Sequence, residues 1–577
     1  MIGPAFIALA AALAVAPQVL RGNSCGHDFD FHLVSWIDAL ASWRHGILYP
    51  HWAPSPNYNA GEPRFVFYPP LTWMLGAALG AVLPWAWVPV ALTFLLLAGT
   101  GLATRALART RLADGAATLA GCIAIFSGYT LYTAYERSAF AELAGGILIP
   151  LLLMLVLREG DGPAWRRGFD GAAIGLAFVV AAAWLSNAPV GVMACYLLAG
   201  SAGAVAVVSR SWTPVKRAAA GAALGLGLAA FYVLPAAVEQ KWVDIRQATD
   251  DPGEQIQNSF LFGHHADPQL ALHNAELRRV SWIAVLMLTA LLVSALVCWR
   301  RRTLPGDKRV WIPLLLIAAV VLILLLPVSL PLWNVLPKLR FLQFPWRWLV
   351  VLEAPLGIFV AAAVWAGGRV RRTAALSACS AVFIGISLLA GRAWFQLCDE
   401  YDAVPGMLAD YRQGDGFEGT DEYAPAGADN SMVAENLPAG CLVDDPAKIL
   451  GRVIADDPQP QWAASQNSCK AALPTVAEAD AAHWEARGQL PAAGYLVLRL
   501  RRYPAWQVRV NGRFAADTGS REDGLMVVPV AAGAVDVTAD WQATPDVCQG
   551  RWISLGALLL LAGLGMATRS RSRGRLK

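Results

Sequence analysis

The sequence predicts a polytopic α-helical membrane protein of about twelve spans that carries a small β-rich domain outside the membrane. Hydrophobic residues make up 56% of the 577-residue chain and charged residues only 15%, against about 25% in soluble globular proteins. The apolar residues also cluster in runs that are long enough to cross roughly 30 Å of hydrocarbon. The net charge of +4 is too small to predict a nucleic-acid partner.

Twelve apolar segments are predicted to span the membrane. The first is similar to a secretory signal, but it lacks a basic region at its start and a clean cleavage site, and further spans follow it. We therefore interpret it as an uncleaved anchor. The predicted spans are 2–20, 86–104, 115–132, 143–157, 169–185, 188–208, 218–236, 279–298, 310–327, 346–366, 373–391 and 552–568.

The loops between these spans are basic on one side only. Because Lys and Arg are retained in short cytoplasmic loops, both termini are predicted to be cytoplasmic. The basic, inner segments are 105–111, 158–167, 209–217, 299–309, 367–372 and 569–577. The outer side then receives 21–85, 133–142, 237–278, 328–345 and 392–551.

A further apolar segment, residues 69–84, is predicted to lie at the outer interface as a helix that does not span. A span there would invert the side of every later loop and place the basic segments outside. Pro69 and Pro70 suit the start of a helix, where a missing N–H costs little. The tryptophans expected at headgroup depth are Trp73, Trp85 and Trp87.

The segment 392–551 has a different composition, with many acidic residues and frequent Pro and Gly. From about residue 495 it contains alternating apolar stretches, YLVLRLRRY, WQVRVNG and LMVVPV, and alternation with NG between runs predicts strands and a hairpin. We predict a β-rich sandwich, which serves more often as a scaffold or lid than as a source of catalytic residues. The predicted regions are a transmembrane domain over 1–391 with the outer loop 21–85, this domain over 392–551, and a final span with a basic tail over 552–577.

The nine cysteines divide between spans and outer segments. Those in or near spans are expected to be packing residues: Cys122, Cys195, Cys298 and Cys379. Five others fall outside, where oxidation is permitted: Cys25, Cys398, Cys441, Cys469 and Cys548. A Cys398–Cys548 disulfide would clasp the base of the outer domain, and Cys441–Cys469 is the natural second pair. Five candidates leave the connectivity open.

The first outer loop contains the densest group of polar residues, in the motif GHDFDFH at 26–32. Its ionisable residues are His27, Asp28, Asp30 and His32. On a helix that begins there, Asp28 and His32 share a face. A carboxylate at the membrane surface can remove a proton from an incoming hydroxyl or amine. Alternatively, Asp28, Asp30 and His32 could hold a divalent cation, Mg²⁺ or Mn²⁺, against a phosphate leaving group.

Four other groups of charged residues are candidates for the same site. Glu62 and Arg64 belong to the same loop, which favours a functional reading of the whole loop over a solvated turn. The turn YERSAFAEL at 135–143 supplies Glu136, Arg137 and Glu142. In PKLRFLQFPWRW at 337–348, Arg340 and Arg347 flank aromatic residues and could bind a lipid phosphate or anchor the interface. Lys241 and Arg246 are weaker candidates of that kind.

Two other classes of function remain open beside an enzyme. Few ionisable residues lie deep inside the predicted spans, whereas ion-coupled transporters usually carry such groups near the midplane. No P-loop motif occurs, which argues against an ATP-driven pump. The alternatives are a glycolipid transporter or flippase, and a non-catalytic scaffold that presents the outer domain at the cell envelope.

Several motifs together resemble one bacterial membrane family. GHDFDFH, LYPHW, FYPPL, RSAFAE, FYVLPA, QFPWR, GFEGTDEY and YPAWQVRVNG are similar to the 6-pyruvoyl-tetrahydropterin-synthase-related membrane domain family, a name that implies no pterin chemistry here. The resemblance covers almost the whole chain. It implies a location in the bacterial cytoplasmic membrane, with the large domain on the periplasmic or extracellular side.

The same plan is similar to that of GT-C glycosyltransferases, in which an acidic residue follows the first span and a PPL segment leads into an interfacial helix. That likeness implies a polyprenyl-phosphate or polyprenyl-diphosphate sugar as donor, inversion at the anomeric carbon, and membrane lipids and an acceptor as partners. It implies that Asp28 is the general base with Asp30 as substitute or helper, and that Glu142 is the second acid. Arg347 would neutralise the departing phosphate, with Arg340 and Arg137 as further phosphate ligands and His27, His32, Glu62 and Arg64 in support.

Overall fold

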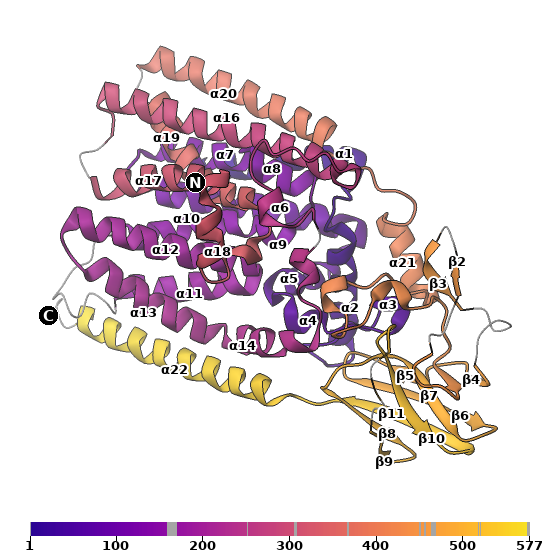
Figure 1. The fold of residues 1–577 in the computed structure, drawn as a ribbon. Coiled ribbons are helices and arrows are strands. Elements are labelled where there is room, and N and C mark those ends of the chain that lie inside the picture. Colours follow the sequence, from indigo (N-terminus) through magenta and orange to yellow (C-terminus); the bar gives the residue numbers. More distant parts are fainter. Residues whose placement is uncertain are drawn as a thin grey trace.

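A computed structural model describes the chain except for residues 1, 159–169, 251, 305–307, 366–367, 449–451, 455–456, 463–468, 517–518, 520 and 574–577. Most of the predicted inner loop 158–167 and the end of the basic tail 569–577 lie outside the described residues. The chain forms a long helical bundle with a β-domain at one end (Figure 1).

Seven helical segments in the described part of the chain are long and apolar enough to cross a membrane. They contain α1 (Ile2–Arg21), α6 (Val88–Arg109), α12 (Ala188–Ser209), α16 (Ala271–Arg301), α19 (Glu353–Trp365, after the 3₁₀ segment Pro345–Leu352), α20 (Arg369–Leu389) and α22 (Pro545–Arg573). Three bent helix pairs raise the number to as many as ten if each pair is counted as one span. These pairs are α7 (Asp114–Ile125) with α8 (Gly128–Tyr135), α13 (Thr213–Leu228) with α14 (Ala230–Glu239), and α17 (Lys308–Leu324) with α18 (Leu330–Val335).

The remaining two predicted spans fall on shorter helices. Residues 143–157 contain α10 (Gly145–Val156), and 169–185 coincide with α11 (Gly171–Ser186). The count of twelve spans therefore stays a prediction. Two predicted inner loops, 158–167 and 209–217, do meet through their described residues. Arg217 there donates to the carbonyl oxygen of Arg158 at 2.8 Å and pairs with Asp170 at 2.6 Å.

The first outer loop folds as short helices against the bundle. It contains α2 (Phe29–Arg44), α3 (Pro56–Asn59), α4 (Arg64–Phe67) and α5 (Pro70–Gly80). The predicted helix at 69–84 is confirmed in α5, which at 11 residues is too short to span. The prediction of an interfacial Trp73 is wrong: α5 packs on α2, and Trp73 is fully buried against Phe65.

The β-domain contains two antiparallel sheets and one separate strand pair. The first sheet has the order β10 (Leu525–Val530), β7 (Gly494–Arg501), β1 (Gly440–Val443), β4 (Ala471–Leu473). The second has the order β5 (Glu478–Ala479), β6 (His483–Leu490), β11 (Gly533–Trp541), β8 (Trp506–Val510), β9 (Arg513–Phe514). Strands β2 (Arg452–Ile454) and β3 (Asp457–Gln461) form the pair. The predicted C-terminal β-domain is thus confirmed.

Local details of the β-domain also follow the sequence. Asn511 and Gly512 join β8 to β9 with φ of 50° and 75°, the left-handed values that a two-residue hairpin turn requires. The Cys441–Cys469 pair is confirmed as a disulfide, and it joins β1 to the residues just before β4.

Aromatic residues of the first outer loop enter the hydrophobic core of the β-domain. Trp52 is 1% exposed and packs edge-on against Trp506, with ring centroids 5.5 Å apart. Phe67 stacks on Tyr423 at 5.7 Å. The loop motifs LYPHW and FYPPL therefore join the two halves of the molecule.

Buried polar contacts hold the same junction. Glu62 accepts from the backbone N–H of Thr420 at 2.8 Å and from Nε of Arg64 at 2.6 Å. Asn57 accepts from Nη1 of Arg501 at 2.9 Å. A Cβ on Gly419 would lie 2.0 Å from Oδ1 of Asn57. The GFEGTDEY motif thus passes close to the outer loop because glycine allows the approach.

A further buried contact joins the β-domain to α14. Glu239 at the end of this helix is fully buried and accepts hydrogen bonds from the hydroxyls of Tyr503 and Thr544, the latter at 2.6 Å. Since a buried group that loses its partner costs about 1–3 kcal/mol, this contact anchors the domain where the chain re-enters the bundle.

We predict that Glu239→Ala loosens the β-domain by about 2 kcal/mol, because two buried hydroxyls lose their acceptor. Hydrogen exchange around Tyr503 and Thr544 should become faster than in the wild type. Asp415→Ala, which removes an exposed carboxylate, is the control and should leave exchange unchanged. Equal exchange in both variants would contradict the anchoring role.

Candidate functional site

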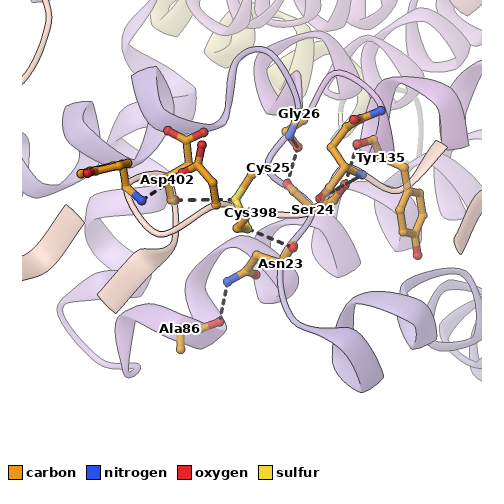
Figure 2. The surroundings of a disulfide bond; sticks show 12 residues. Asn23, Ser24, Cys25, Gly26, Ala86, Tyr135, Cys398 and Asp402 are labelled. Atoms are coloured by element: carbon orange, nitrogen blue, oxygen red, sulfur yellow. Dashed lines mark hydrogen bonds between the residues drawn. A yellow bond between two sulfur atoms is a disulfide. The ribbon is translucent and has the colours of Figure 1, made fainter. Parts of the chain in front are cut away.

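The segment that links α1 to α2 is tied by a disulfide to the segment that follows α20. Cys25 pairs with Cys398, with their Cα atoms 4.9 Å apart (Figure 2). The expected Cys398–Cys548 pair is wrong, and Cys548 is an exposed free thiol. The reason is helix packing: α20 lies on α1, whereas α22, which carries Cys548, packs on α13 and α14 at the opposite edge of the bundle (Figure 1).

Backbone contacts hold this linker against the turn between α8 and α9 (Phe140–Leu143). The hydroxyl of Ser24 donates to the carbonyl oxygen of Tyr135 at 2.7 Å, as Figure 2 shows. Three residues beyond the disulfide, the N–H of Asp28 donates to the carbonyl oxygen of Arg137 at 2.9 Å. The backbone of Asp28, just before α2, is therefore placed by the turn that carries Arg137.

Gly26 is required for this close approach. A Cβ at Gly26 would lie 2.4 Å from the carbonyl oxygen of Glu136, a backbone atom that cannot swing aside. The Gly26 N–H also donates to the hydroxyl of Ser138 at 3.1 Å. Ser138 has a left-handed φ of 50°, which is uncommon for a residue with a side chain. Its hydroxyl, which donates to the carbonyl oxygen of Ser24 at 2.7 Å, helps to hold that conformation.

Four charged side chains from distant segments form a continuous series, here called the charge chain: Asp28, Arg137, Glu142 and Arg347. Arg137 lies 3.7 Å from Asp28 and 2.6 Å from Glu142, and Nε of Arg347 lies 3.4 Å from the same Glu142 oxygen. The side chain of Asp28 is 40% exposed, whereas those of Arg137 and Glu142 are 6% and 2% exposed. The chain thus runs from a solvent-accessible carboxylate into the bundle.

Arg347 is the member with unused hydrogen-bonding capacity. Its side chain is 11% exposed, and its guanidinium makes no hydrogen bond to any described residue of the protein. It lies over the ring of Phe344, 5.2 Å from the centroid. A guanidinium presents donors in a fork that matches two oxygens of a phosphate, so Arg347 can bind one while Nε remains beside Glu142.

Tyr68 and His32 border the charge chain. Asp28, Arg347 and Arg137 all act electrostatically on the phenol of Tyr68, and burial raises its pKa so that it stays protonated. The Tyr68 hydroxyl lies 3.5 Å from Nε2 of His32. Burial lowers the pKa of His32 to about 4, so this fully buried imidazole is neutral at pH 7. Tyr68 belongs to the motif FYPPL. The sequence did not predict that this tyrosine lies next to the charge chain.

The two other polar residues of GHDFDFH do not join the charge chain. His27 and Asp30 are exposed, and neither forms an ion pair within the described chain. The ligand atoms of Asp28, Asp30 and His32 do not gather into a metal-sized group. Within the described residues, only Glu478, His483 and Glu485 of the β-domain bring three such atoms within 4.8 Å of one another.

The remaining predicted residues lie elsewhere. Glu62 and Arg64 bond to each other in the buried junction with the β-domain. Arg340 is exposed and donates to Gln257 at 3.3 Å. Glu136 pairs with Arg279, and Lys241 lies over Trp242, 5.4 Å from the ring centroid. Arg246 is exposed.

One acid close to the site was not predicted. Glu353 begins α19 inside a candidate span and is 3% exposed. It accepts from the hydroxyl of Thr130 at 2.6 Å. The sequence could have indicated this residue, because Glu353 is the single acid within the apolar segment 346–366. A carboxyl group inside a membrane span is costly and is usually functional.

Comparison with known proteins identifies one family. A family model described as "6-pyruvoyl-tetrahydropterin synthase related domain; membrane protein" matches residues 65–398, which is more than half of the chain. The match includes Arg137, Glu142 and Arg347 and begins after Asp28. No protein of curated function matches the chain.

We predict that Gly26→Ala lowers the melting temperature in detergent and displaces Asp28, because the added Cβ meets backbone. Gly200→Ala is the matched control, since nothing lies within 4 Å of its Cβ in α12. The control should be neutral or stabilising, as alanine favours a helix interior by about 1 kcal/mol. Similar behaviour of the two variants would argue against close packing of the linker.

We predict that His32 destabilises the protein in acid. Its pKa is about 4 in the folded chain and 6.5 when exposed, so the unfolded state binds the extra proton between these values. Stability is lost as pH falls from 6.5 to 4. At about 1.4 kcal/mol per pH unit, the loss is about 3 kcal/mol.

The variant His32→Gln should lose less stability than the wild type over this range, as followed by thermal melts at pH 4 to 7. Buried groups other than His32 titrate in both proteins, so the difference between the two isolates its contribution. Parallel pH profiles would contradict a buried, neutral His32.

Proposed function

The chain belongs to the 6-pyruvoyl-tetrahydropterin synthase related family of membrane proteins, and we propose that it is a membrane glycosyltransferase. The proposed donor is a sugar linked to polyprenyl phosphate or diphosphate. The proposed setting is the outer side of the bacterial cytoplasmic membrane, where an acceptor reaches Asp28 near the β-domain. The proposal rests on the charge chain rather than on the family, whose description names no such activity.

The observation that carries the proposal is that one site contains an accessible carboxylate and a guanidinium with unused hydrogen-bond donors. Asp28 is 40% exposed, while Arg347 is nearly buried and has free donors. Arg137 and Glu142 connect the two, at 3.7, 2.6 and 3.4 Å along the series. A transferase that displaces a phosphate needs these two elements: a base for the acceptor and a cation for the leaving group.

The proposed reaction is a single displacement. The carboxylate of Asp28 takes the proton of the acceptor hydroxyl as the acceptor oxygen bonds to the anomeric carbon. The bond from that carbon to the phosphate oxygen breaks, and the electron pair leaves with the lipid phosphate. Arg347 stabilises the added negative charge, and the proton passes from Asp28 to water because this side chain is accessible.

The other members of the site position these two groups. Glu142 contacts both arginines through one oxygen and accepts from the hydroxyl of Tyr129 through the other. Arg137 lies 3.7 Å from the carboxylate of Asp28 and orients it. The neutral phenol of Tyr68 is a donor available to the phosphate or to the acceptor.

A glycolipid transporter or flippase is the alternative that one observation favours. Glu353 is a buried acid in a candidate span, a feature that is common in ion-coupled transport. Movement of a labelled glycolipid across vesicles without release of lipid phosphate would favour that function. Release of lipid phosphate favours the transferase.

We predict that Asp28→Asn lowers the release of lipid phosphate by about 10²–10⁴-fold, the usual contribution of a general base. The assay uses purified protein in nanodiscs with a panel of polyprenyl-phosphate sugars and candidate acceptors. Asp30→Asn is the matched control, because Asp30 lies two residues away, is exposed and has no ion pair within the described chain.

The control variant should keep most of the wild-type rate with every active donor. Unchanged turnover in Asp28→Asn would refute the assigned base. Equal losses in both variants would show that the loop is sensitive to any loss of charge, which also contradicts a specific role for Asp28.

A further inference from the structure

A small internal cavity lies between the charge chain and Glu353. It offers about 10 Å³ to the centre of a water molecule, which is near the minimum for holding one water. Its polar lining consists of Tyr129, Thr130, Thr133, Glu142 and Glu353. The cavity therefore joins the inner end of the charge chain to the buried acid of α19.

Two oxygen atoms at this cavity lack partners in the described protein. They are Oγ1 of Thr133 and Oε2 of Glu353, and both are fully buried. The other carboxyl oxygen of Glu353 accepts from Thr130 at 2.6 Å and from Ser127 at 3.4 Å. Buried polar atoms are almost always hydrogen-bonded, to protein or to water, so the two unpartnered oxygens indicate a bound water.

Gly146 keeps the space beside Glu353 open. A Cβ there would lie 3.1 Å from Oε2 of Glu353 and 2.5 Å from the hydroxyl of Thr100. A side chain at this position would crowd the unpartnered oxygen of Glu353.

The charges around the cavity indicate the protonation state of Glu353. The charge chain is neutral as a set, because two carboxylates, Asp28 and Glu142, face two guanidiniums, Arg137 and Arg347. Glu353 has no ion pair within the described chain. If ionised, it would add an uncompensated negative charge inside an apolar bundle, which is far more costly than holding a proton.

We propose that Glu353 and this cavity form a proton-binding site. Glu353 carries a proton on Oε2 and donates it to one water molecule. The water also accepts from the hydroxyl of Thr133 and donates to the carboxylate of Glu142. Glu353 thereby supports Glu142 through the water and acts as a positioning residue. Glu353 binds its proton whether or not the charge chain serves a transferase reaction.

Infrared spectroscopy of the purified full-length protein in nanodiscs tests this proposal without any substrate. The wild type should show the C=O stretch of a protonated carboxylic acid at pH 7, shifted in D₂O and absent in Glu353→Gln. The band should be the same in sodium chloride and in choline chloride. Absence of a band that depends on Glu353 would overturn the proposal.

A band that disappears in sodium chloride would also overturn it, in favour of a sodium site. If Glu353→Gln does not fold, Thr133→Val provides the second test. This variant keeps the acid and removes one partner of the water, so the band should persist at a shifted frequency. An unshifted band would show that no water links Thr133 to Glu353.

Discussion

The constraint on which the site depends is the compensation of charge inside an apolar bundle. A buried ion is tolerated only when it is paired and hydrogen-bonded. Arg137 and Glu142 meet this condition through each other, Arg347 is paired with Glu142 but keeps its donors unused, and the series ends at the accessible Asp28. The charge chain, which is the proposed site, is therefore also a structural requirement: removal of Glu142 would leave two buried guanidiniums without the carboxylate that they share.

The rest of the molecule places the ends of this chain. Asp28 is held by the Cys25–Cys398 disulfide and by the close contact at Gly26. Farther along the first outer loop, Trp52 packs in the hydrophobic core of the β-domain and Glu62 accepts a hydrogen bond from Thr420. Several motifs that carry the family resemblance thus have a structural role, because they close the junction between the bundle and the β-domain. The β-domain therefore supports the outer loop, and the charge chain lies in the bundle.

The sequence predicted the helical membrane class and the β-domain, because apolar runs and period-two alternation are local signals. It also predicted Asp28, Arg137, Glu142 and Arg347, but from three separate motifs, because a sequence does not reveal contacts between residues more than one hundred positions apart. The same limit explains the wrong Cys398–Cys548 pair, which depended on which helices are neighbours. Glu353 was missed because hydropathy averages a single acid into its apolar surroundings.

The central claim is that the charge chain binds a lipid phosphate through Arg347. Its most direct test is the binding of a polyprenyl phosphate to purified wild-type protein, Arg347→Gln and Arg340→Gln, followed by native mass spectrometry. The account predicts that Arg347→Gln weakens binding about tenfold or more, or at least about 1.4 kcal/mol, while Arg340→Gln binds like the wild type. Equal binding by Arg347→Gln and the wild type would contradict the account.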